Sequence, residues 1–174
     1  RDPSALIQSD GGRVGWWTGI CLNVNQGADP VATARPPARD LDFLSGASMV
    51  ASRRFVETAG PMPEDYFLYY EEVEWAARRG ALPLVLCENA VVHHHGGTAI
   101  GTGAVNRLAS PFALYFNNRN RMRYVRRVRP ATLPAAYLAS LARVGKLATR
   151  GAWHEALSAF LGLNQLAPPR RVVK

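Results

Sequence analysis

The chain has 174 residues, of which 48% are hydrophobic and 20% are charged, and its formal net charge is +8 with neutral histidines. This balance argues against a disordered chain, and the length suits one domain with an appendage rather than two large domains. Two cysteines are too few for a disulfide framework, and no apolar run approaches the roughly 18 residues that a membrane span needs.

The first 60 residues predict little regular structure before one short helix. Residues 14–17 form a candidate strand, and residues 23–40 form a loop rich in Pro, Gly and Asp. Ser52 is a residue type that caps helix N-termini, and Gly60 is a type that follows helix C-termini. We therefore predict a helix over residues 53–59.

The middle of the chain predicts a second helix and two strands. A helix over residues 71–79 would have acidic residues in its first turn and two arginines in its last, which complements the helix dipole. The apolar runs 82–86 and 90–93 predict buried strands. Strands that alternate with helices predict the α/β class.

The last third of the chain is helical in pattern and strongly basic. Helices are predicted over residues 112–129, 133–144 and 153–161. Residues 1–106 hold 8 basic and 12 acidic side chains, a net charge of −4, whereas residues 107–174 hold 13 basic and one acidic, a net charge of +12. We expect the basic arm, residues 107–129, either to bind an anionic membrane surface or lipid diphosphate, or to be a solvated helix face.

Three acids lie within four positions, at Glu71, Glu72 and Glu74, next to the aromatic residues Tyr70 and Trp75. A carboxylate beside aromatic side chains is partly desolvated, which raises its pKa and suits it to general-base chemistry. The alternative is an ordinary acidic first turn of a helix.

Three consecutive histidines, His93, His94 and His95, precede Gly96 and Gly97. Imidazole is a common metal ligand, and a glycine pair permits close approach of an ion or a phosphate. The alternative is that the imidazoles serve packing or loop hydrogen bonds.

Four motifs follow one another over residues 41–120. They are DFLSGASMVASRRFVETAG at 42–60, YFLYYEEVEWAARRG at 66–80, AVVHHHGGT at 90–98 and YFNNRN at 115–120. In this order they resemble family-2 inverting glycosyltransferases of the GT-A fold, in particular the bacterial rhamnosyltransferase-like group that builds cell-surface polysaccharide.

The resemblance implies a role for each acid and for the histidines. Glu72 stands where the family has the aspartate that deprotonates the acceptor hydroxyl, with Glu71 and Glu74 as acidic neighbours. His94 stands where a histidine binds the divalent cation, Mg²⁺ or Mn²⁺, that holds the donor diphosphate, and His95 is the alternative ligand. The residues predicted to bind substrate are Gly46, Ala47, Tyr70, Trp75, Arg119 and Asn120.

The resemblance also implies a domain organisation. Residues 1–110 would be the acceptor-side and catalytic part of a GT-A domain of the α/β class, and residues 111–174 a basic helical C-terminal extension. The nucleotide-binding half and its Asp-x-Asp motif are expected upstream of residue 1, which is not a Met.

The function implied is transfer of a sugar, with inversion, from a nucleotide-diphosphate donor to a saccharide or a lipid-linked acceptor. We expect a cytoplasmic protein, peripheral at the inner membrane face, whose 174 residues alone are inactive. One alternative is a saccharide-binding fragment that cannot use a sugar nucleotide. A weaker alternative is an Arg-rich nucleic-acid-binding module over residues 119–129, where Tyr124 alone would serve for base stacking; we expect no nucleic-acid partner.

Overall fold

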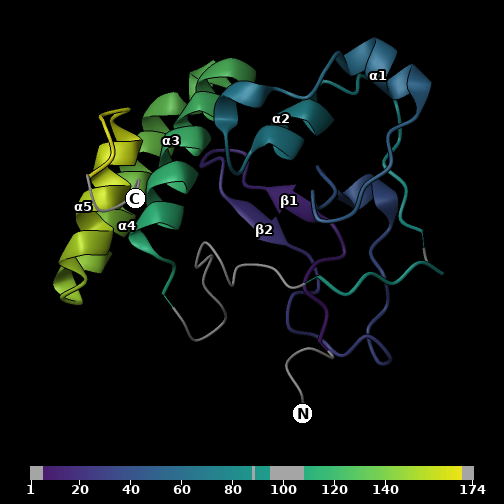
Figure 1. Cartoon of the computed structure of the whole chain (residues 1–174), viewed down its shortest axis with the longest axis horizontal. Coiled ribbons are helices and arrows are strands. Elements are labelled where there is room, and N and C mark those ends of the chain that lie inside the picture. The colour runs from purple at the N-terminus through teal and green to yellow at the C-terminus, as the bar shows by residue number, and fades with distance from the viewer. Residues whose placement is uncertain (1–5, 88, 95–107, 170–174) are drawn as a thin grey trace. The chain divides into compact units, whose positions relative to one another are not determined.

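The computed structural model describes residues 6–87, 89–94 and 108–169, and helices make up most of their regular structure (Figure 1). The strands are β1 (Gly12–Val14) and β2 (Cys21–Asn23). The helices are α1 (Arg53–Ala59), α2 (Glu71–Ala77), α3 (Pro111–Val128), α4 (Leu133–Thr149) and α5 (Trp153–Leu163). Short 3-10 turns occupy Ala38–Asp40, Glu64–Tyr66 and Pro130–Thr132. The chain is thus mixed in class but dominated by helix.

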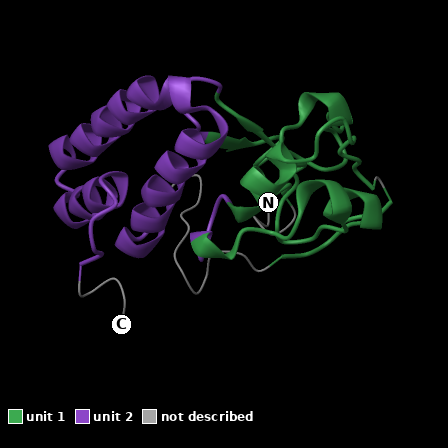
Figure 2. Ribbon diagram, turned by 90° about the horizontal axis from the view of Figure 1, so that it is seen from above, with its two compact units in different colours: residues 1–15, 21–65, 71–95 green, residues 16–20, 66–70, 96–174 purple. Residues whose placement is uncertain are grey.

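The chain divides into two compact units (Figure 2). Unit 1 consists of Arg1–Gly15, Cys21–Asp65 and Glu71–His95. Unit 2 consists of Trp16–Ile20, Tyr66–Tyr70 and Gly96–Lys174, so two short segments from the first half of the chain belong with the C-terminal helices.

The core of unit 1 forms around a small antiparallel hairpin. Strands β1 and β2 pair with Val14 opposite Cys21, and the amide of Gly12 donates to the carbonyl of Phe43 at 2.9 Å. A Cβ at Gly12 would lie 2.1 Å from the ring of Phe43, so only glycine fits there. The side chains of Val14, Leu41 and Phe43 are buried beside this hairpin. Because a two-stranded hairpin alone is marginally stable, this apolar packing is what holds the sheet.

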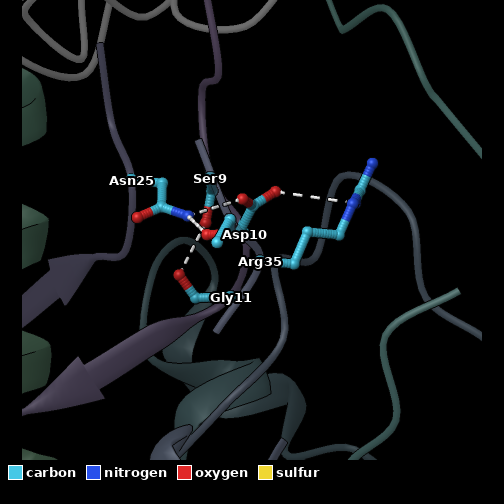
Figure 3. Close-up of polar contacts among 6 residues, drawn as sticks. Ser9, Asp10, Gly11, Asn25 and Arg35 are labelled. Atoms are coloured by element: carbon cyan, nitrogen blue, oxygen red, sulfur yellow. Dashed lines mark hydrogen bonds and ion pairs between the residues drawn. The ribbon is translucent and has the colours of Figure 1, made fainter. Parts of the chain in front are cut away.

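A buried carboxylate fastens the long loop of unit 1 (Figure 3). Asp10 is 8% exposed and accepts a hydrogen bond of 2.9 Å from Nδ2 of Asn25, while a guanidinium nitrogen of Arg35 lies 3.7 Å away. Asn25 Nδ2 also donates to the carbonyl of Ala34 at 3.0 Å. The cluster satisfies a buried charge with loop residues, which fixes where that loop returns to the hairpin.

The predicted helix over residues 53–59 is confirmed as α1. The Oγ of Ser52 accepts from the amide of Phe55 at 3.1 Å, and Gly60 follows the helix with φ +71°. The second predicted helix is confirmed as α2, although it ends at Ala77 rather than at residue 79.

The prediction of two buried strands over residues 82–86 and 90–93 is wrong. Neither stretch pairs as a strand within the described residues, and Val85, Val91 and Val92 are 69%, 71% and 57% exposed. The apolar runs are real, but a strand also needs a neighbour to receive its backbone hydrogen bonds. The described residues therefore do not form strands that alternate with helices.

The regular structure of unit 2 is dominated by the three packed helices α3, α4 and α5 (Figure 1). The N-terminus of α3 is capped. The Oγ of Ser110 accepts from the amide of Ala113, and Pro111 occupies the first position of α3. The buried rings of Tyr115 and Phe116 form a core cluster against which Leu161 of α5 packs. None of the described helices is both long enough and apolar enough to cross a membrane.

Candidate functional site

The first turn of α2 carries the three predicted acids, and they have different environments. Glu74 is 2% exposed and pairs with Arg78, which directly follows the last residue of α2. The charge of Glu74 is therefore balanced by a residue four positions later. Glu71 and Glu72 each have a buried Oε2 atom without a hydrogen-bond partner among the described residues.

The carboxyl groups of Glu71 and Glu72 both have raised pKa values. Burial and, to a smaller extent, the negative charge of Glu71 raise the pKa of Glu72, and the backbone amides of Glu72 and Val73 offset part of the effect, so that the pKa is about 7. Burial also raises the pKa of Glu71. A carboxylate with a pKa near neutrality can accept a proton from a substrate at physiological pH, and its protonated form can return one.

Gly46 lies next to the carboxylate of Glu72. A Cβ built on Gly46 would come within 4.0 Å of Cγ and Cδ of Glu72. The structure thus brings together two residues, 26 positions apart, that the sequence assigned to one site. Ala47 follows in the same turn and is exposed, with its amide 3.3 Å from Oγ of Ser45.

Trp75, predicted to bind substrate, joins α2 to the end of α1. Its Nε1 donates to the carbonyl of Gly60 at 2.8 Å. Its ring meets Phe55 edge to face, with the centroids 4.7 Å apart. These contacts hold the helix that carries Glu72 against its neighbour in unit 1.

The segment Tyr66–Tyr70, which leads directly into α2, has a strained backbone. Phe67, Tyr69 and Tyr70 have φ values of +68°, +67° and +74°. Aromatic residues seldom adopt this left-handed conformation, so such a run needs strong support from its surroundings.

Asn120 of α3 supplies that support within unit 2. The side chain is fully buried, and its Nδ2 donates to the carbonyl oxygens of Tyr66, at 2.9 Å, and Tyr69, at 3.1 Å, and also to that of Leu68. Arg119 adds a hydrogen bond of 2.7 Å to the carbonyl of Tyr66. Both residues were predicted to bind substrate, and in the structure both side chains donate hydrogen bonds to the backbone of this segment.

Tyr70, a third predicted substrate-binding residue, is also held inside unit 2. Its side chain is 3% exposed, and its hydroxyl donates to the carbonyl of Gly19 at 2.8 Å. Gly19 has φ +65°, and a Cβ there would lie 2.4 Å from Val125. Sequence reasoning missed Gly19 and the anchoring role of Asn120. The available signal for Asn120 was an amide side chain set among aromatic residues in a helix.

His94 lies on the surface of unit 1 and contacts Gln8. Gln8 donates from Nε2 to the carbonyl of His94 at 2.6 Å, and the ring Nδ1 lies 3.2 Å from Oε1 of Gln8. His95, the alternative ligand, lies outside the described residues. No three His, Cys, Asp or Glu side chains gather as a metal-binding group in the described part of the chain. Binding of Mg²⁺ or Mn²⁺ by His94 therefore stays a prediction.

The described part of the basic arm predicted over residues 107–129 is partly interior, so it is not simply the solvated helix face that was one of the two expectations. Arg121 is 3% exposed and donates to Asn118 and, at 2.8 Å, to Oγ of Ser140. The guanidinium of Arg127 lies 5.5 Å from the ring centroid of Tyr66. Several of these arginines stabilise unit 2 through hydrogen bonds and cation–π contacts.

Comparison of the chain with protein-family models, with curated proteins and with solved structures found no match.

Proposed function

We propose that this chain is the acceptor-side, catalytic-base part of an inverting glycosyltransferase of the GT-A type. The observation that carries the proposal is the desolvated carboxylate of Glu72, which lies beside Gly46 and has its pKa raised to about 7. The order of the four sequence motifs supports the reaction class, since the same acid, Glu72, stands at the position of the base in the resemblance.

The proposed reaction is one in-line displacement. The acceptor hydroxyl oxygen attacks the anomeric carbon of the donor and forms the new glycosidic bond. The bond from that carbon to the nucleoside diphosphate breaks, and its electron pair leaves with the diphosphate. The hydroxyl proton passes to the carboxylate of Glu72 in the same step, because a carboxylate is too weak a base to remove it beforehand.

The neighbouring acids would have supporting roles. Glu71 keeps negative charge near Glu72, which raises the proton affinity of the base. Glu74 pairs with Arg78 and so contributes to the stability of α2 rather than to proton transfer.

The test uses the full-length protein with a panel of nucleotide-diphosphate sugars and saccharide or lipid-linked acceptors. We expect Glu72→Gln to lower transfer about 100-fold or more, because the amide cannot accept the proton. The matched control is Glu64→Gln, which removes an exposed carboxylate seven positions before α2 and should leave transfer unchanged. Near-normal turnover by Glu72→Gln would remove Glu72 from the proposed role.

A further inference from the structure

Helix α5 has its large apolar side chains on the outside. Trp153, Leu157 and Phe160 are 67%, 52% and 39% exposed. At about 100° per residue these three positions fall within an arc of about 60°, so they form one continuous stripe along the helix. A surface helix in a globular protein ordinarily turns such a stripe toward the core.

The opposite face of α5 explains this arrangement. Four of the five buried residues of α5 are small, namely Ala156, Ser158, Ala159 and Gly162, and the fifth is Leu163. A Cβ at Gly162 would lie 2.2 Å from the carbonyl oxygen of Tyr115, so α5 packs against α3 at backbone distance. Close packing through these small residues leaves Trp153, Leu157 and Phe160 on the side that faces away from α3.

Helix α4, which packs against α5, adds an apolar residue and positive charge. Leu138 is 65% exposed. Arg143, Lys146 and Arg150 are exposed at the C-terminal end of α4 and in the turn that leads to α5. Over residues 133–163 the only acidic side chain is Glu155, and it is half-buried. The exposed charge on this helical hairpin is therefore positive.

We infer that the stripe of Trp153, Leu157 and Phe160, together with Arg143, Lys146 and Arg150, docks on an anionic lipid surface. An exposed apolar stripe that includes Trp, combined with Lys and Arg, is what helices lying in a membrane interface present. Anionic headgroups would receive the three cations while the stripe enters the boundary of the acyl chains.

Charge favours lipid over a second copy of the chain as the occupant. A symmetric dimer formed through this surface would place three cations of one copy close to the same three of the other, which like-charge repulsion disfavours. This docking surface differs from the predicted arm over residues 107–129, where Arg121 is interior. The inference rests on the helices of unit 2 and does not depend on the proposed function.

The test measures binding of the 174-residue chain to sedimented vesicles, made either of phosphatidylcholine alone or with phosphatidylglycerol added. We expect binding only to the anionic vesicles, weakened by salt. Both Leu157→Asp and the double variant Lys146→Glu with Arg150→Glu should lower the affinity about tenfold or more. The fluorescence of the bound chain should shift to the blue, and Trp153→Phe should remove most of that shift.

Matched controls change unit 1 in the same chemical way. Val50 is 98% exposed, so Val50→Asp is the control for Leu157→Asp. The double variant Arg39→Glu with Arg54→Glu is the control for the charge reversal, since both arginines are exposed. Leu157→Gln, with circular dichroism of every variant, separates lost binding from lost folding.

Three results would overturn the inference. The first is no binding to anionic vesicles at low salt. The second is binding that the stripe and charge variants lower no more than the controls do. The third is a dimer, detected by light scattering, that Leu157→Asp dissociates, because the stripe would then be covered by a second copy.

Discussion

The side-chain nitrogen Nδ2 of Asn120 lies 2.9 Å from the carbonyl oxygen of Tyr66, although 54 positions separate the two residues. The same nitrogen lies within hydrogen-bond distance of the carbonyls of Leu68 and Tyr69, so three backbone acceptors share the two N–H donors of one buried side chain of α3. Those acceptors belong to the segment in which three aromatic residues have positive φ. The hydrogen bonds to Asn120 thus help to compensate for backbone strain just before α2.

We expect Asn120→Ala to lower the free energy of unfolding by about 2–4 kcal/mol, because it leaves a cavity and removes the donor from buried carbonyls. Asn117→Ala, on the same helix but only half-buried, is the control and should change stability by less than about 0.5 kcal/mol. Urea unfolding of both variants measures the difference. Equal stability of the two would show that the hydrogen bonds of Asn120 contribute little.

Two glycines within helices give a matched pair for the packing of unit 2. Gly162→Ala should destabilise the chain by about 2 kcal/mol or more, because the new Cβ would meet the backbone of Tyr115 at 2.2 Å. Gly145→Ala should stabilise it by about 0.5–1 kcal/mol, because nothing lies within 4 Å and alanine favours the helix. Thermal unfolding distinguishes the two. A neutral Gly162→Ala would contradict close packing of α5 on α3.

The raised pKa of Glu72 predicts a pH-dependent stability. Between its ordinary value of 4.5 and about 7, the unfolded chain releases this proton while the folded chain keeps it. The free energy of unfolding must therefore fall as the pH rises through that window. Glu72→Gln has no carboxyl group at this position, so this fall in the free energy of unfolding should be absent.

We expect the stability gained by Glu72→Gln over the parent chain to grow by on the order of 2 kcal/mol between pH 5 and pH 8.5. Denaturant unfolding at a series of pH values measures it, and Glu64→Gln, which changes an exposed side chain, should show no such growth. If the difference in the free energy of unfolding between Glu72→Gln and the parent chain is constant with pH, the carboxylate of Glu72 is not desolvated.

Local signals predicted the helices well. Ser52 and Gly60 stand at the two ends of α1, as their residue types indicate, and the apolar spacing from Trp153 onward indicated α5. Caps and periodicity act within a few residues, so sequence carries them directly. The helix itself was predicted, but the outward orientation of its stripe depends on Gly162 fitting against Tyr115 and could not be predicted locally.

Pairing and burial over long sequence distances were predicted less well. Residues 82–86 are apolar enough for a strand, but the sequence does not say whether another strand lies beside them. For the site, the acids and Gly46 were singled out together, and the structure places Gly46 beside Glu72. The engagement of Asn120 and Tyr70 inside unit 2 depends on contacts more than 50 positions apart, which no local pattern encodes.

The most direct test of the account is a titration of the glutamate carboxyl groups of the folded chain by nuclear magnetic resonance, with Glu72→Gln used to assign the signal. A desolvated Glu72 would give one carboxyl signal with a midpoint near pH 7 that is absent from the spectrum of Glu72→Gln. If the signal lost in that variant instead titrates below about pH 5, as an ordinary glutamate does, Glu72 is not a desolvated base and the proposed chemistry fails.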